Sequence, residues 1–74
     1  MEIPNKLYVI VFFLNGNFVG YSKISDIYWT KYPHCAQFFV DEEEAKHRLL
    51  WLQKIHKHNG ELTLNIKTYN VEGE

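Results

Sequence analysis

An unbroken apolar run, followed at once by Asn-Gly, is the feature that most constrains how this chain can fold. Leu7 to Leu14 reads Leu-Tyr-Val-Ile-Val-Phe-Phe-Leu, with no Gly or Pro. Such a run is too short for a typical helix and predicts a strand that is apolar on both faces, and therefore central in its sheet. Asn15-Gly16 then predicts a tight hairpin turn, because a type I′ turn needs positive φ at both central residues.

The return strand of this hairpin is predicted over Asn17 to Ile24. The tight turn sets the register and predicts three favourable cross-strand pairs: Phe13 with Phe18, Phe12 with Val19, and Ile10 with Tyr21. Gly20 would then lie opposite Val11, where it is predicted to mark a bulge.

A helix is predicted to begin after Asp41. Asp41 is a favourable N-cap, and Glu44 three residues later completes a capping-box pattern. The core-facing stripe is predicted to contain Ala45, Leu49, Leu52 and Ile55, with His56 at its border and Trp51 widening it. Asn59-Gly60 is the predicted end of the helix, with Gly60 as the left-handed residue that follows it.

Two more strands complete the predicted fold. Ala36 to Val40 reads as a short strand before the helix, and Glu61 to Tyr69 alternates apolar and polar residues after it. A crossover helix favours a right-handed connection, which would place the last strand beside the first and parallel to it, in the order 3-2-1-4. We therefore expect one α+β domain over residues 1–74, a small three- to four-stranded mixed sheet with one helix packed on one face.

One helix cannot cover both faces of this sheet, and both faces of the hairpin are apolar. One face is predicted to carry Leu7, Val9, Val11, Phe13, Phe18 and Ile24. The other is predicted to carry Tyr8, Ile10, Phe12, Leu14, Val19 and Tyr21. Exposed apolar patches of this kind mark interfaces. Two explanations stay open: the aromatic segment 25–35 folds over the uncovered face, or that face binds another protein or a second copy of the chain.

Aromatic residues make up the predicted binding surface, because Tyr and Trp dominate the energetics of protein interfaces. In the 25–35 segment the candidates are Tyr28, Trp29 and Tyr32. On the uncovered sheet face they are Tyr8, Phe12 and Tyr21.

Charge argues against a general nucleic-acid binder. The chain has eight Lys and Arg against nine Asp and Glu, a net charge of −1, whereas nucleic-acid binders usually show a basic excess. Aromatic side chains on a sheet do stack on bases, and Tyr8, Phe12 and Tyr21 could form such a platform. A nucleic-acid-binding accessory role is therefore the alternative to protein binding, and a structural homodimer is another.

Cysteine content and hydropathy indicate the compartment. Cys35 is the single cysteine, which excludes an intramolecular disulfide and favours a reducing environment. The longest apolar run, Leu7 to Leu14, is far shorter than the roughly 20 residues of a membrane-spanning helix. Glu2 is acidic where a signal peptide would be positive. We expect a cytoplasmic protein with no membrane partner.

No residue pattern predicts catalysis, a metal site or a cofactor. His34 and Cys35 are adjacent, so in an extended segment their side chains point to opposite faces. His47 and His58 would lie roughly 16 Å apart along the helix, too far to share one metal ion. The acidic residues 41–44 are explained by capping and by the helix dipole. We expect a protein that is not an enzyme.

The whole-chain pattern resembles small accessory proteins encoded by bacteriophages and prophages. It combines Leu7-Tyr8-Val9-Ile10, the Asn15-Gly16 hairpin, a segment from Ala36 to Ala45 that leads into the helix, and a closing Leu-x-Leu-x-Ile strand. The resemblance implies a protein that binds and blocks or redirects a host protein, such as a CRISPR effector or other defence machinery. The implied site of action is then the cytoplasm of the host cell.

Overall fold

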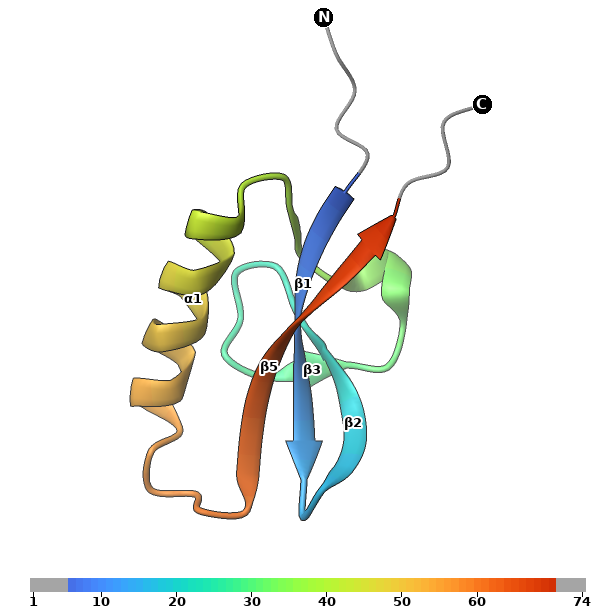
Figure 1. Ribbon diagram of the computed structural model, residues 1–74. Helices are drawn as coiled ribbons and strands as arrows, with labels where there is room; N and C mark the ends of the chain where they lie inside the picture. Colours follow the sequence, from blue (N-terminus) through green and yellow to red (C-terminus); the bar gives the residue numbers. More distant parts are fainter. Residues whose placement is uncertain (1–5, 71–74) are drawn as a thin grey trace, which may run out of the picture.

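The computed structural model describes residues 6–70, which form one helix and a curled antiparallel sheet (Figure 1). Residues 1–5, including the Glu2 of the signal-peptide argument, and residues 71–74 lie outside that range. The elements in chain order are β1 (Lys6–Leu14), β2 (Asn17–Ser22), β3 (Trp29–Thr30), a 3₁₀ turn (Pro33–Cys35), β4 (Phe38–Phe39), α1 (Glu42–Ile55) and β5 (Leu62–Asn70). The α+β class is confirmed, with five strands where three to four were predicted.

β1 is the central strand, as its apolar sequence predicted. β5 pairs with it from Lys6–Asn70 to Leu14–Leu62. β2 pairs with residues 11–14 of β1, and β4 pairs with Tyr8 and Val9. Since a strand has only two edges, β2 and β4 share the edge opposite β5.

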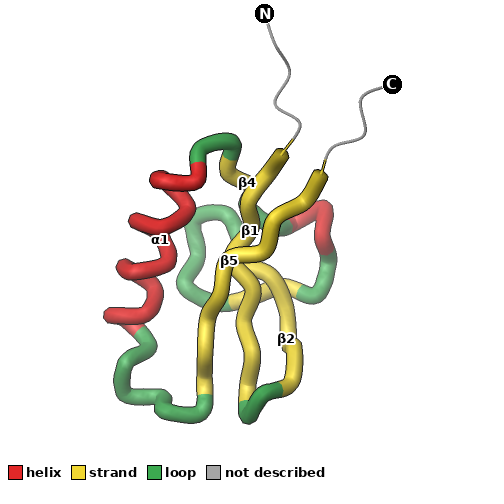
Figure 2. Tube along the Cα trace, viewed as in Figure 1, coloured by secondary structure: helices red, strands yellow, loops and turns green. Residues whose placement is uncertain are grey.

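The predicted parallel pairing of the last strand with the first is wrong, and the sheet is antiparallel rather than mixed. β4 and β5 both run opposite to β1, so they are parallel to each other with β1 between them. The helix therefore connects two parallel strands, as predicted, but these are β4 and β5, which do not pair because β1 lies between them (Figure 2). Because β4 has only two residues, the sequence does not reveal that the chain crosses over from this strand to β5.

The hairpin turn forms as predicted, with φ of 54° at Asn15 and 81° at Gly16. Phe13 pairs with Phe18, but the register then shifts, so that Phe12 lies opposite Gly20 and Val11 opposite Tyr21. The predicted pairs of Phe12 with Val19 and of Ile10 with Tyr21 are therefore wrong. The extra residue in β2 moves Tyr21 to the other face of the sheet.

Gly20 is required by the close approach of β3. A Cβ atom at this position would lie 2.6 Å from the carbonyl oxygen of Thr30 and 2.8 Å from Cδ1 of Trp29. The short strand β3, which pairs Thr30 with Tyr21 and Trp29 with Ser22, can therefore pack only against a glycine.

α1 begins as predicted, with the carboxylate of Asp41 accepting a hydrogen bond from the backbone N–H of Glu43 (3.1 Å). It ends at Ile55, four residues before Asn59, and Gly60 does not adopt a left-handed conformation. The side chain of His56 is held by the 25–35 segment at the point where the helix stops. Within residues 6–70, no helix has the length and apolar character needed to cross a membrane.

The main core lies between α1 and the sheet. Its buried members are Ile10, Phe12, Phe39, Ala45, Leu52, Leu62 and Leu64. Trp51 is exposed on the outer side of α1, so its predicted place in the core-facing stripe is wrong. A smaller cluster on the helix-free face of the sheet contains Val9, Val11 and Ala36.

Candidate interaction surfaces

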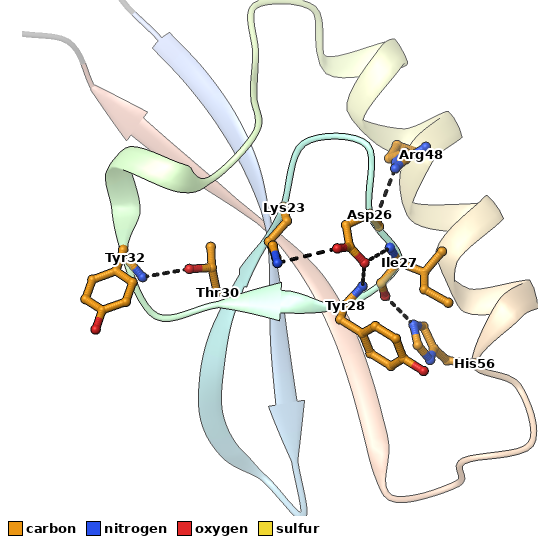
Figure 3. A network of polar contacts seen from close by, with 8 residues as sticks. All are labelled: Lys23, Asp26, Ile27, Tyr28, Thr30, Tyr32, Arg48 and His56. Carbon is orange, nitrogen blue, oxygen red and sulfur yellow. Dashed lines mark hydrogen bonds and ion pairs between the residues drawn. The ribbon is translucent and has the colours of Figure 1, made fainter.

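The 25–35 segment is organised by Asp26. Its carboxylate accepts hydrogen bonds from the backbone N–H groups of Ile27 (2.7 Å) and Tyr28 (3.0 Å) and pairs with Lys23 (3.4 Å) (Figure 3). These interactions, led by the hydrogen bond from Tyr28, lower the pKa of the Asp26 carboxyl below its ordinary value of 3.8. The start of the segment is thus a hydrogen-bonded turn on the surface, which leads into β3.

Two side chains, one within α1 and one at the residue after its end, hold this turn against the helix. A guanidinium nitrogen of Arg48 donates to the carbonyl oxygen of Asp26 (3.1 Å), and Nε2–H of His56 donates to that of Ile27 (2.6 Å) (Figure 3). The start of the segment therefore lies on the helix side of the sheet. Of the two explanations left open for the uncovered face, a covering 25–35 segment does not hold for Ile27 and Trp29, which pack on the main core instead.

The three aromatic residues predicted as contacts in this segment do not form one surface. Trp29 packs against Phe12 with ring centroids 5.2 Å apart and belongs to the main core. Tyr28 and Tyr32 are 57% and 64% exposed. Figure 3 shows them at opposite ends of β3, so neither extends a patch formed by the other.

Tyr8, Phe12 and Tyr21 do not share an open face, and that prediction is wrong. Phe12 is fully buried, and Tyr8 packs with it against the helix-side core. Tyr21 lies on the helix-free face because of the register shift in β2. Of these three, Tyr21 alone lies on a sheet face that α1 leaves uncovered.

An aromatic stripe crosses that helix-free face, and we define it as Phe13, Phe18, Tyr21, Tyr69 and Phe38. Successive ring centroids are 6.0 Å apart for Phe13 and Phe18, 5.2 Å for Phe18 and Tyr21, and 5.6 Å for Tyr69 and Phe38. Tyr69 Oη–H donates to Tyr21 Oη (3.3 Å), which joins the two halves of the stripe. This hydrogen bond raises the pKa of Tyr69 above 10.0.

The outer members of the stripe are accessible. Phe18 is 49% exposed and Phe38 37% exposed, while Phe13, Tyr21 and Tyr69 are half-buried above Val9 and Val11. The ammonium group of Lys67 lies 5.2 Å from the ring centroid of Tyr69. The stripe thus both closes a small second core and presents aromatic edges to solvent.

A groove lies between the end of α1 and the first half of β5. The residues that line it are Gln53, His56, Lys57, Asn59, Gly60, Leu62, Thr63, Leu64 and Asn65. On the outer side of the helix, a shallower hollow is lined by His47, Leu50, Trp51 and Lys54. The two hollows place Lys57 and Lys54 on different surfaces.

The histidines and the cysteine do not come together. Cys35 is exposed with a free thiol, and the ring of His34 packs instead on Tyr32, with centroids 5.7 Å apart. His56 is engaged with Ile27. Within residues 6–70, no group of three or more His, Cys, Asp or Glu side chains could hold a metal ion.

Sequence reasoning missed the contribution of Tyr69 and Phe38 to the stripe. Tyr69 shares the face of Thr63, Asn65 and Lys67, a row that reads as solvent-facing in the sequence. Phe38 belongs to a two-residue strand whose facing is set only by its pairing with Val9.

Comparison with known proteins identifies no relative of this chain. No family model, no curated protein and no solved structure matches it.

Proposed function

We propose that this chain is a non-enzymatic protein-binding module that contacts its partner through the aromatic stripe. The observation that carries this proposal is the run of five aromatic side chains in contact on the face that lacks a helix. Large, rigid aromatic rings supply contact area at little cost in conformational entropy, which is why they dominate protein interfaces.

The charge around the stripe favours a protein over a nucleic acid. The ammonium group of Lys67 lies over the ring of Tyr69, within the stripe. Lys23, which follows β2, is paired with the carboxylate of Asp26, so its charge is balanced. With a net charge of −1, the chain lacks the basic surface that drives binding to phosphates. The resemblance to phage accessory proteins suggests, as part of this proposal, that the partner is a host protein in the host cytoplasm, where contact inhibits or redirects it.

The test compares two sets of exposed apolar residues. The double variant Phe18→Ser, Phe38→Ser removes the accessible ends of the stripe, and Leu50→Ser is the control, because Leu50 is an exposed apolar residue on the helix. Each purified chain is immobilised and used to capture proteins from a bacterial lysate, and the captured proteins are identified by mass spectrometry. We expect a protein that wild type and Leu50→Ser retain and that the double variant loses.

Two results would overturn this assignment. Retention of the same protein by the double variant would remove the stripe from the interface. Capture of nucleic acid alone, with an affinity that falls steeply with added salt, would instead support the accessory role in nucleic-acid binding. Light scattering over a dilution series separates both from a homodimer, which would persist in wild type and dissociate in the double variant.

A further inference from the structure

The outer edge of β5 is a long strand edge that no other described strand pairs with. Among the described strands, β5 pairs with β1 alone, in a register of nine residue pairs without a bulge. Natural proteins usually block such an edge with proline, bulges, charged side chains or a covering helix or loop. The sequence of β5, Leu-Thr-Leu-Asn-Ile-Lys-Thr-Tyr-Asn, contains no proline, and Lys67 is its one charged residue.

The hydrogen bonding identifies which backbone groups face outward. The N–H of Asn15 donates to the carbonyl oxygen of Glu61 (2.8 Å), at the end of the ladder between β1 and β5. Bonded and non-bonded positions alternate along an antiparallel strand. The backbone groups of Thr63, Asn65 and Lys67 therefore point toward β1, and those of Leu64, Ile66 and Thr68 point toward the free edge.

Leu62 confirms this alternation independently. By the same count its backbone faces away from β1, and its N–H donates to the carbonyl oxygen of Asn59 (3.1 Å), which lies outside the sheet. The turn after α1 therefore uses the first outward N–H of β5. The next three outward positions, Leu64, Ile66 and Thr68, follow along the same edge.

The first half of this edge forms one wall of the groove beside α1, and its second half, with Ile66 and Thr68, continues beyond the groove. Four consecutive residues of β5, from Leu62 to Asn65, line the groove. Successive side chains of a strand point to opposite faces, so four in a row can line one hollow only where it opens along the strand's edge. Figures 1 and 3 view the molecule from different sides, and in both α1 lies beside the first half of β5, on the side away from β1.

The chemistry of the groove indicates what would fill it. A row of outward N–H and C=O groups at the two-residue spacing of a strand is complementary to another extended backbone. The ionisable side chains among the lining residues are His56 and Lys57, and none is acidic. We propose that this groove binds an extended peptide segment of a partner protein, which adds to β5 as a further strand and places an acidic side chain beside Lys57.

A second copy of β5 fits this groove less well than such a peptide. β5 carries Lys67 and no acidic residue, so it would bring a positive charge to a strand next to Lys57. This groove is also separate from the aromatic stripe, and its occupancy does not depend on the function proposed for the stripe. Variants of Phe18 and Phe38 therefore leave this test intact.

The first test uses random peptides of about twelve residues, long enough to pair along the whole edge, displayed on phage and selected against the full chain. Selected peptides are synthesised, and amide exchange is measured by NMR with and without them. We expect acidic sequences that slow exchange at Leu64, Ile66 and Thr68 by about tenfold or more. Exchange at Asn65 and Lys67, whose N–H groups already bond to β1, should change little.

The second test is a matched pair of charge reversals. Lys57→Glu changes the groove, and Lys54→Glu makes the same change in the hollow on the outer side of the helix. We expect Lys57→Glu to weaken binding of the selected peptides about fivefold or more and Lys54→Glu to weaken it less than about twofold. Equal losses would overturn the placement of the acidic side chain.

Three outcomes would overturn the assignment of the groove to a peptide. One is a selection that yields no peptide binding below about 100 μM. Another is a set of bound peptides that leave exchange at Leu64, Ile66 and Thr68 unchanged. The last is protection of those three amides that grows with protein concentration in the absence of peptide, which would assign the edge to a second copy of the chain.

Discussion

The two faces of the sheet are built from the same strands but are closed in different ways. On the helix side, Ile10 and Phe12 are fully buried under α1 and under Trp29. On the other face, Val9 and Val11 are buried by side chains of the sheet itself and by Ala36, and the aromatic rings above them stay partly exposed. The face under the helix is buried and contributes to stability. The other face is covered only by aromatic rings of the sheet, and these rings stay exposed enough to bind a partner.

The largest expected difference between the faces is in stability. Phe12→Ala should lower the free energy of unfolding by about 3–5 kcal/mol, because it leaves a cavity in the main core. Phe18→Ala should lower it by only about 1 kcal/mol, because half of that ring is already exposed. Urea denaturation of both variants measures the contrast, and equal losses would show that the stripe is core rather than surface.

Replacement of Gly20 tests the close contact between β2 and β3. Gly20→Ala should lower the free energy of unfolding by about 1–3 kcal/mol, because its Cβ would collide with the backbone of Thr30. Gly60→Ala is the control, since a Cβ there meets nothing within 4 Å and the residue has no positive φ. We expect that control to be neutral or stabilising by up to about 1 kcal/mol in urea denaturation. A loss of stability in Gly60→Ala as large as in Gly20→Ala would contradict this account.

The hydrogen bond within the stripe gives a smaller effect that depends on pH. The folded state raises the pKa of Tyr69, so the bond contributes stability below the unfolded value near 10.0 and loses it as pH rises through the folded pKa. Tyr21→Phe removes the acceptor, and the pKa of Tyr69 should move back toward 10.0. Ultraviolet titration of the tyrosines measures this shift, and an unchanged high-pH transition in the variant would assign it to another tyrosine.

On the helix side, the corresponding pH dependence is acidic and smaller still. The folded pKa of Asp26 is lowered, so its contribution is present above the unfolded value near 3.8 and is lost as pH falls through the folded pKa. Asp26→Asn should therefore lose less thermal stability than wild type between about pH 6 and about pH 3. Circular dichroism melts at both values measure this, with Asp41→Asn, at the N-cap of α1, as the control. If wild type and Asp26→Asn lost the same thermal stability on acidification, Asp26 would not be the cause of this pH dependence.

Local chemistry made much of the fold predictable. The central position of β1, the Asn15-Gly16 turn and the N-cap at Asp41 each depend on residues close together in the sequence. A bulge was predicted at Gly20 and the register does shift beside it, but the cross-strand pairs were predicted without that shift, and no local signal says that β3 would approach Gly20. The prediction failed at the end of α1 because the partner of His56 is Ile27, a residue 29 positions away in the sequence.

The sequence predicted that aromatic residues would form the candidate surfaces, but it did not predict which of them would lie together. That aromatic residues would remain accessible followed from their number and from the single helix. Tyr21 lies on a face without a helix, but the register shift places it there and not the predicted pairing with Ile10. Phe12 and Trp29 were predicted to be contacts, yet both pack in the main core. A one-residue bulge decides which strand residues share a face, so a list of face members beyond it could not be read from periodicity.

The sequence by itself determined the hairpin strands, the last strand, the start of the helix with its cap, and the turn, because those depend on side chains within a few positions of one another. The tertiary structure alone decided that β5 runs antiparallel to β1, that the 25–35 segment packs on the helix side, and that Phe38, Tyr69 and Tyr21 meet across the sheet. The physical reason is that strand direction, register and facing depend on pairing between distant segments. Both proposed binding surfaces, the aromatic stripe and the edge of β5, arise from that pairing.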